Sequence, residues 1–287
     1  MPYAPAMDLD LVAKLGSVTN STHGFIYFSE SASQAYAELG LTGRQQYFAS
    51  RGAALGTVPA EVVIATFFNF NPEIVRRAIP AAWDVASPEE IQTVRMRAAG
   101  SQLAALGAID DAALDEATEL AGRMMAGVTD EARPLAGANR SVAEPDDPWE
   151  RLWQRLTVIR EWRGDAHVAA LAAAPVTALE ALVLHAATGV VPRAALQATR
   201  QWSDDAWEAT FADLADRGLV SATGEFTDEG RAFRDEIEHR TNVASAPLVD
   251  AVGEADTRRL IDLLKPMQAA LIEAGAFARL RGVSSDS

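Results

Sequence analysis

Residues 214–232, LADRGLVSATGEFTDEGRA, decide the fold that this sequence predicts. Gly218 ends an amphipathic helix, and short apolar segments lie on either side of Gly224. We therefore predict two very short strands, 218–221 and 224–227, that form a small β-wing. Thr227 has the side chain of a helix N-cap, so a long polar helix is expected to begin directly after it.

Two helices are predicted immediately before this stretch. Proline at the first position opens a helix over 192–199, and Ser203 can cap a second helix over 204–217. Trp207, Phe211, Leu214 and Ala215 fall on one face of the second helix, which is the spacing of a buried stripe. The two helices and the short turn between them predict a helix-turn-helix.

The rest of the chain of 287 residues also has a helical pattern, because Ala and Leu recur every three or four residues. An irregular arm is expected up to Gly24, and residues 25–28 fit either a short strand or the entry to a helix. Further helices are predicted near 30–39, 43–54, 59–68, 88–106 and 110–127, and from 148 onwards. The stretch 129–147 is rich in Pro, Gly, Asn and Asp and predicts a linker. We place an N-terminal helical domain at 1–145 and a second domain at 146–287.

The segments LADRGLV (214–220) and FTDEGRA (226–232) resemble the winged helix of MarR-type regulators. This resemblance covers roughly residues 148–275. It implies an all-α fold with a small β-wing, a MarR-like winged helix-turn-helix domain, and a homodimer closed by a helix over 256–274. The whole chain also resembles an uncharacterised actinobacterial family of MarR-related proteins with an extra N-terminal helical half. The segments that carry this second resemblance are 23–24, 47–51, 66–70 and 163–167, and it implies no particular activity.

Charge argues against ordinary DNA reading. The chain has 40 acidic and 25 basic residues, which gives a formal net charge of −15. DNA-binding proteins place Arg, Lys, Asn or Gln on the second helix of the motif, but no basic residue occurs here between Arg200 and Arg217. Five carboxylates occupy that stretch instead: Asp204, Asp205, Glu208, Asp213 and Asp216. Carboxylates repel the phosphate backbone, so the sequence disfavours DNA as a partner.

Two functions of different classes remain. The first is a small-molecule-binding protein on a winged-helix scaffold without ordinary DNA reading. Its ligand would be anionic or aromatic and would lie in a hydrophobic pocket between the two halves. The same pocket could also catalyse a reaction. The alternative is a ligand-responsive MarR-like transcriptional regulator that binds DNA as a dimer. Arg193 and Arg200, or the N-terminal half, would then supply the basic surface.

The densest polar cluster is the segment 160–167. If a helix continues through Gly164, then Arg160, Arg163 and His167 share one face. That face could hold an anion between the two guanidinium groups, with His167 as a general acid or base beside Asp165. A solvated network of ion pairs within one helix is the other interpretation of the same residues.

Four residues of the N-terminal half complete the predicted site. His23 precedes a glycine and an aromatic run and could serve as a second general acid or base, although a capping or core role also fits a lone histidine. Tyr47 and Arg51 lie one helical turn apart, and Asn69 lies among phenylalanines, so all three are candidate ligand-binding residues. Asn71 precedes a proline and is interpreted as a helix N-cap.

Several kinds of chemistry are excluded by composition or spacing. The chain has no cysteine, which rules out disulfides and thiolate sites, and its four histidines lack the spacing of a helical metal site, so no metal is predicted. No phosphate-binding or dinucleotide-binding motif is present, so no cofactor is predicted either. No apolar run reaches the ~20 residues of a membrane span, and the first residues are unlike a secretory signal. We expect a cytoplasmic protein with no membrane partner.

Overall fold

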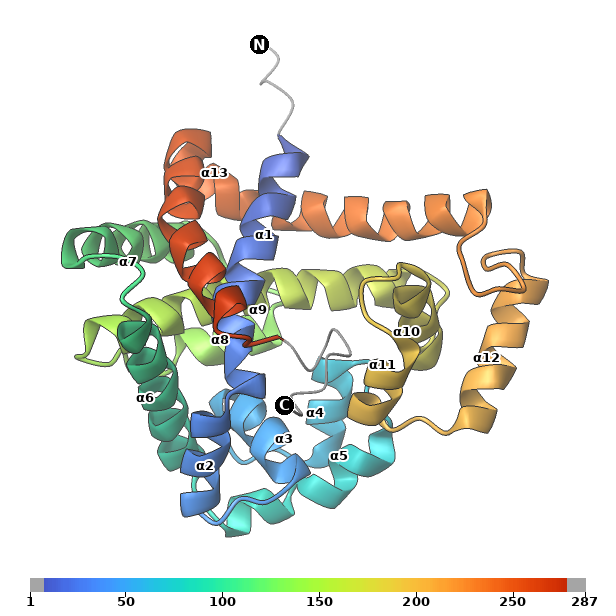
Figure 1. Ribbon diagram of the computed structural model, residues 1–287, viewed down its shortest axis with the longest axis horizontal. Coiled ribbons are helices and arrows are strands. Elements are labelled where there is room, and N and C mark those ends of the chain that lie inside the picture. Colours follow the sequence, from blue (N-terminus) through green and yellow to red (C-terminus); the bar gives the residue numbers. More distant parts are fainter. Residues whose placement is uncertain (1–7, 278–287) are drawn as a thin grey trace. The chain divides into compact units, whose positions relative to one another are not determined.

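The computed structural model describes residues 8–277, which are almost entirely helical (Figure 1). The all-α part of the predicted fold class is confirmed. The α-helices in the first part of the chain are α1 (Leu9–Gly24), α2 (Glu30–Glu38), α3 (Arg44–Gly52), α4 (Ala60–Phe67), α5 (Pro72–Ala78), α6 (Pro88–Leu106) and α7 (Asp111–Ala126). The later ones are α8 (Pro134–Arg140), α9 (Pro148–Ala173), α10 (Ala178–Ala187), α11 (Arg193–Arg200), α12 (Asp204–Asp216) and α13 (Asp228–Glu273). Three short 3-10 turns occur as well: η1 (Phe25–Phe28), η2 (Ala53–Leu55) and η3 (Ala81–Asp84).

These helices form two compact units, each built from separate stretches of chain. Unit 1 contains the described residues of Met1–Ile26, Met96–Ala166 and His239–Ala274. Unit 2 contains Tyr27–Arg95, His167–Glu238 and the described residues that follow Ala274. The segment predicted as a linker carries α8 and belongs to unit 1. Because the units are groups of contacting residues rather than continuous stretches, the division of the chain at 145/146 stays a prediction.

Local capping explains where several helices begin. Ser29, Asp110 and Ser203 each accept a hydrogen bond from a backbone N–H in the first turn of α2, α7 and α12. The observed bounds of α2, α3, α4, α6 and α7 confirm the helices predicted between residues 30 and 127 to within a few residues. Helix α9 runs without a break through Gly164, and residues 25–28 form the 3-10 turn η1.

The irregular arm predicted before Gly24 is wrong over its described part. Residues 9–24 form α1, whose N-cap Asp8 accepts a hydrogen bond from the backbone N–H of Leu11 at 3.0 Å. Leu11 and Leu15 are buried at 1% exposure each, so the helix is held by packing of an apolar stripe. The helix was missed because the segment Ser17–Thr22 is mostly polar. In the structure, hydroxyl groups of this segment donate to backbone carbonyls of the preceding turn, which fits a helix.

The predicted β-wing is also wrong. Among residues 8–277 there is no strand, and the segments around Gly224 make a single isolated bridge between Val220 and Phe226. The chain leaves α12 at Gly218, whose φ is +72°, and Thr227 already caps α13 by accepting from the backbone N–H of Gly230 at 3.0 Å. The N–H of Gly224 bonds to the oxygen of Ser221 at 2.9 Å and makes 221–224 a turn, so only residues 219–220 and 225–226 remain to pair between that turn and the helix ends.

The helix-turn-helix itself lies in unit 2 and is formed by α11 and α12, with α10 packed against them (Figure 1). Gln201 ends α11 in the left-handed conformation, with φ of 55°, and Ser203 starts α12. The buried core of this region is apolar and includes Leu182, Leu196, Trp207 and Leu214. Both helices of the predicted motif are therefore confirmed, and Trp207 and Leu214 form its buried face.

Helix α13 follows and is interrupted at Gly253, where φ is +82° and ψ is 164°. In the described part of the chain, no single helix is long and apolar enough to cross a bilayer, and only the bent pair Pro148–Ala173 with Ala178–Ala187 passes by length and composition.

Candidate functional site

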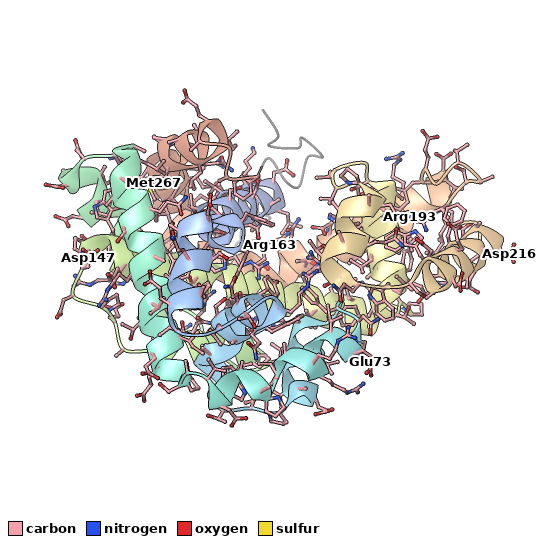
Figure 2. The ribbon with its side chains drawn as sticks, turned by 60° about the horizontal axis from the view of Figure 1, so that its bottom comes forward. Glu73, Asp147, Arg163, Arg193, Asp216 and Met267 are labelled. Carbon is pink, nitrogen blue, oxygen red and sulfur yellow. The ribbon has the colours of Figure 1, made fainter. Side chains whose placement is uncertain are left out.

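Helix α12 is the second helix of the motif, and its exposed surface is acidic. Its five carboxylates, at 204, 205, 208, 213 and 216, are all exposed. Figure 2 shows Asp216 at the end of α12. No basic residue occurs within the helix to offset these charges. A phosphate backbone brought to this face would meet repulsion along the whole helix.

The arginines on either side of α12 are held in ion pairs. Arg193, at the start of α11 (Figure 2), binds Asp204 at 3.3 Å and Glu208 at 2.5 Å. Arg217, which follows α12, binds Glu180. These carboxylates compete directly with phosphate for the same guanidinium groups. A phosphate group at Arg193 would therefore have to compete with Asp204 and Glu208.

A cluster of aromatic rings around an arginine lies elsewhere in unit 2. We call it the Tyr47–Arg51 cluster, and its members are Tyr27, Tyr47, Phe48, Arg51, Phe67 and Phe70. The Tyr47 ring centre lies 5.0 Å from that of Tyr27 and 5.2 Å from that of Phe70. Such distances are those of direct ring contacts. Two of the predicted ligand-binding residues, Tyr47 and Arg51, are therefore brought together.

Arg51 is only 9% exposed, and its guanidinium carbon lies 4.2 Å from the centre of the Phe67 ring. Nη1 of Arg51 also donates a weak hydrogen bond of 3.4 Å to the Tyr47 hydroxyl. A guanidinium against a ring face is stabilised by a cation–π interaction, and its planar edge matches a carboxylate or phosphate. The cluster therefore combines the groups that recognise an anionic, aromatic molecule.

Two further buried polar residues adjoin this cluster and were missed from the sequence. Arg95 is fully buried and donates from Nη2 to the Tyr27 hydroxyl at 2.8 Å. Tyr36 is 4% exposed, and burial raises its pKa to about 12, against the opposing effects of Arg95 and Ser50. Tyr36 therefore keeps its proton at neutral pH and can act as a donor.

A signal for Arg95 was present in the sequence. Ile91, Arg95, Ala99 and Leu103 follow one another at a spacing of four on α6, and all four are buried. A charged residue within an otherwise apolar stripe is an exception to the pattern of a surface helix. Such an exception indicates a buried polar role.

The backbone next to the cluster is strained at Phe68. Its φ of 61° and ψ of −61° are those of a γ-turn that bulky residues rarely adopt. The turn is closed by a hydrogen bond of 2.8 Å from the N–H of Asn69 to the oxygen of Phe67. Strain of this kind costs about 1–3 kcal/mol and persists only where surrounding contacts hold it, frequently at functional sites.

Asn69 and Asn71 both form hydrogen bonds to residues of the helix-turn-helix. The backbone oxygen of Asn69 accepts from Nε1 of Trp202 at 3.2 Å. The side chain of Asn71 accepts from the N–H of Glu73 at 3.0 Å, which confirms it as the N-cap of α5, and donates to the oxygen of Gln201. These contacts lie within unit 2.

In unit 1, His23 is completely buried in a network on α9. Its Nδ1 lies 2.9 Å from the hydroxyl of Thr157, and this hydroxyl already donates to the oxygen of Trp153 at 2.9 Å. Nδ1 of His23 must therefore be the donor to Thr157. The ring stacks on Trp153 at 5.2 Å, and Nε2 faces Oε1 of Glu161 at 4.0 Å.

The two arginines of the 160–167 segment take separate partners in unit 1. Arg160 binds Glu161 at 2.6 Å and Asn20 at 3.2 Å. Arg163 donates to Oδ1 of Asn242 at 3.1 Å. Its side chain passes over Gly16, where an added Cβ would lie 2.5 Å from Cδ of Arg163, so a larger residue at that position would require the Arg163 side chain to shift.

His167 and Asp165 differ from each other in their surroundings. His167 is about one third exposed in unit 2, and its Nδ1 lies 3.8 Å from Oε1 of Glu238. The carboxylate of Asp165 accepts hydrogen bonds of 3.0 Å from the backbone N–H groups of Leu135 and Ala136 at the start of α8. Asp165 therefore caps a helix, a role that its position in the sequence did not show.

The seven predicted site residues divide between the units. His23, Arg160 and Arg163 belong to unit 1, whereas Tyr47, Arg51, Asn69 and His167 belong to unit 2. A pocket that they share stays a prediction. In unit 1, the hollow beside Gly16 and Arg163 is too small for a water molecule. Over residues 8–277, no group of three His, Asp or Glu side chains is placed to hold a metal ion.

Comparison with known proteins agrees with the helix-turn-helix. A search of curated proteins and a search of solved structures gave no match. The sequence does match the family described as the Helix-turn-helix family, over residues 12–278. This scaffold is the type that DNA-binding regulators use. Since the match spans most of the chain and α11 and α12 supply the motif, the protein belongs to this helix-turn-helix family.

Proposed function

We propose that this helix-turn-helix protein binds a small anionic, aromatic molecule and does not read DNA bases through α12. The absence of base reading rests on the exposed face of α12, which presents five carboxylates and no basic side chain. Base edges in the major groove are read mainly by donors such as Arg, Asn and Gln. A carboxylate face offers acceptors only, and its charge opposes approach to the duplex.

The Tyr47–Arg51 cluster is the proposed ligand site. A guanidinium at 9% exposure against Phe67, with the Tyr47 hydroxyl beside it, supports recognition of a carboxylate attached to a ring. The strained turn at Phe68 supports the same location, because backbone strain occurs frequently at functional sites. The ring centres of Tyr47 and Phe70 lie 5.2 Å apart, so a ligand that enters between these rings would separate them.

Finer features of the protein remain part of this proposal. They are the relation to MarR-type proteins, an actinobacterial origin, the homodimer, a cytoplasmic location, and a general acid or base role for His23 or His167. The buried contact between His23 and Glu161 supports proton handling in unit 1. His167 and Glu238 are each about one third exposed, so their contact fits a surface ion pair at least as well.

Titration with benzoate, the simplest anionic aromatic probe, tests the ligand site. We expect saturable binding by calorimetry, at least ~10-fold weaker in the variant Arg51→Lys, which keeps the charge but loses the planar fork. The matched control is Arg77→Lys on the exposed surface of α5, which should bind as the wild type does. Equal affinity in Arg51→Lys and wild type would refute the site.

Titration against random and genomic duplex fragments at two salt concentrations tests the absence of base reading. We expect no sequence preference at either concentration. Native mass spectrometry of the same sample would show any small molecule that is retained on purification. Salt-sensitive binding with sequence preference would instead support the second candidate function.

That second candidate is a ligand-responsive DNA-binding regulator. One specific observation favours it, namely the hydrogen bonds of Asn69 and Asn71 to the turn between α11 and α12. They connect the surroundings of the proposed ligand site to the motif that would contact DNA. The acidic face of α12 argues against it, so a basic surface would have to come from elsewhere in the protein.

A further inference from the structure

The last carbonyl groups of α11 are bound by a side chain that is distant along the chain. A helix leaves its final four carbonyl oxygens without donors of its own. Arg44 donates from Nη2 to the oxygen of Ala198 at 2.6 Å and from Nη1 to that of Thr199 at 3.2 Å. The guanidinium charge is also favourable at the negative end of the helix. Arg44 therefore acts as a cap on α11.

Asn71 continues this cap into the turn. Its backbone N–H donates to the oxygen of Arg200 at 3.2 Å, and its Nδ2 donates to the oxygen of Gln201 at 2.9 Å. At the same time its Oδ1 accepts from the N–H of Glu73 at 3.0 Å. The side chain of Asn71 thus joins the start of α5 to the end of α11.

The third residue of the turn is held by the same segment. Nε1 of Trp202 donates to the oxygen of Asn69 at 3.2 Å. The guanidinium of Arg200 lies 4.8 Å from the centre of the Phe70 ring. Residues 69–71 therefore contact all three of the consecutive residues 200–202, which connect the two helices of the motif.

At its other end, the segment 67–71 belongs to the Tyr47–Arg51 cluster. Phe67 lies under the guanidinium of Arg51, and Phe70 contacts the Tyr47 ring. Between them lies the strained turn at Phe68. A strained backbone is held by its neighbours, so a change in those contacts can shift its conformation.

We propose that residues 67–71 form a conformational linkage that couples the Tyr47–Arg51 cluster to the turn of the helix-turn-helix. The ligand that would drive the linkage rests on the proposed function, but the linkage itself does not. A molecule that separates Tyr47 from Phe70 displaces the segment and weakens its bonds to residues 200–202. The carbonyl groups of Arg200 and Gln201 then lose the donors of Asn71, whereas Arg44 keeps its bonds to Ala198 and Thr199, so the turn after α11 can change its angle.

The first test uses Asn71→Asp in the full chain. Aspartate keeps the oxygen that caps α5 but lacks the amide donor to Gln201. We expect the amides of residues 198–204 to exchange hydrogen about 3- to 10-fold faster than in the wild type, which corresponds to one lost hydrogen bond. The control is Ala65→Glu, at an exposed position of α4. It adds the same charge, lies outside residues 67–71, and should leave these rates unchanged.

Trp202→Phe provides a second variant if the aspartate disturbs folding. It removes only the indole donor to Asn69 and keeps an aromatic ring in place. Faster exchange at 198–204 and at 66–71 together is expected, since the bond joins the two segments. Unchanged exchange at 198–204 in both variants, relative to Ala65→Glu, would overturn the proposal.

Coupling to the cluster is tested with Tyr47→Leu, which removes the ring contact with Phe70. We expect faster exchange at 198–204 in the wild-type background and less than a ~2-fold further change in the Asn71→Asp background. Phe48→Leu, which also removes a ring contact with Phe70, replaces Tyr47→Leu if that variant does not fold. Equal effects in both backgrounds would show that cluster and turn are independent, which refutes the linkage.

Failure of the proposed function is distinguishable from failure of the linkage. The exchange measurements use no ligand, so they assess the linkage alone. If benzoate does not bind but the double-mutant coupling is found, the linkage stands and the ligand class is wrong. If benzoate binds at Arg51 and the double-mutant coupling is absent, the linkage is wrong and the site stands.

Discussion

The exposed face of α12 and the Tyr47–Arg51 cluster belong to the same unit and use charge in opposite ways. On α12, Asp204 is 85% exposed, and its partner Arg193 is 37% exposed. In the cluster, Arg51 is 9% exposed against the Phe67 ring. Water stabilises the first set of charges at little cost, whereas the second set depends on the geometry of its neighbours. The difference indicates that the cluster, rather than the helix-turn-helix face, is where substitutions have large consequences.

The largest effect is expected for Phe48→Ala in the cluster. Phe48 is completely buried and contacts the rings of Tyr47, Phe67 and Phe70. The truncation should lower the free energy of unfolding by about 3–5 kcal/mol, because it leaves a cavity as well as losing apolar contact. Urea denaturation measures this. A loss below ~1 kcal/mol would mean that the cluster repacks freely and would break the comparison.

A somewhat smaller loss is expected for Arg95→Gln. The guanidinium is fully buried and donates to Tyr27, so its removal leaves partners without a donor and should cost about 2–4 kcal/mol. The matched control is Arg77→Gln on the exposed surface of α5, which should change stability by less than ~0.5 kcal/mol. Equal losses in the two variants would contradict a special role for burial.

Tyr36 should make stability depend on alkaline pH. Burial raises its pKa from 10.0 to about 12, so the folded protein keeps a proton that the unfolded chain loses. The stabilisation is fully present below pH 10 and is lost as the pH rises to about 12. Urea midpoints measured from pH 9 upwards should fall less steeply in Tyr36→Phe. Identical slopes in the variant and wild type would place Tyr36 in contact with solvent.

The smallest effect is expected on the helix-turn-helix face. Arg193→Ala removes ion pairs with Asp204 and Glu208, which are 85% and 61% exposed, so the loss of stability should be at most ~1 kcal/mol. The same change should leave benzoate binding unaltered. A thermal unfolding scan at low and high salt checks this, since a surface pair weakens with salt. A loss of stability in Arg193→Ala as large as that in Phe48→Ala would show that the face of α12 and the Tyr47–Arg51 cluster do not differ in this way.

Local patterns predicted much of the fold because their causes are local. Ser203 caps α12, Asn71 caps α5, and Trp207 and Leu214 form a buried stripe, each within a few residues of its partner. The β-wing failed for a reason that is also local but quantitative. The predicted ends of the two helices, at Gly218 and Thr227, are correct. The residues between them form a single bridge, Val220 to Phe226, instead of two strands.

The candidate site was harder to predict, because its members meet across long stretches of chain. Tyr47 and Arg51 were found, since one helical turn separates them and places them on one face. Arg95 and Tyr36 were missed, because a sequence does not show that a charged and a phenolic side chain are buried together. The strain at Phe68 had no signal either, as phenylalanine is a residue that rarely adopts positive φ.

By itself, the sequence determined the helical class, the helices of the motif and the acidity of α12, because periodicity, capping and charge are properties of neighbouring residues. Only the tertiary structure decided how those charges are used. It placed Arg193 among carboxylates, Arg51 against a ring, and Asn71 at the end of α11. These outcomes depend on burial and on contacts between different elements, which for Asn71 and Gln201 join residues 130 positions apart and which no local pattern encodes.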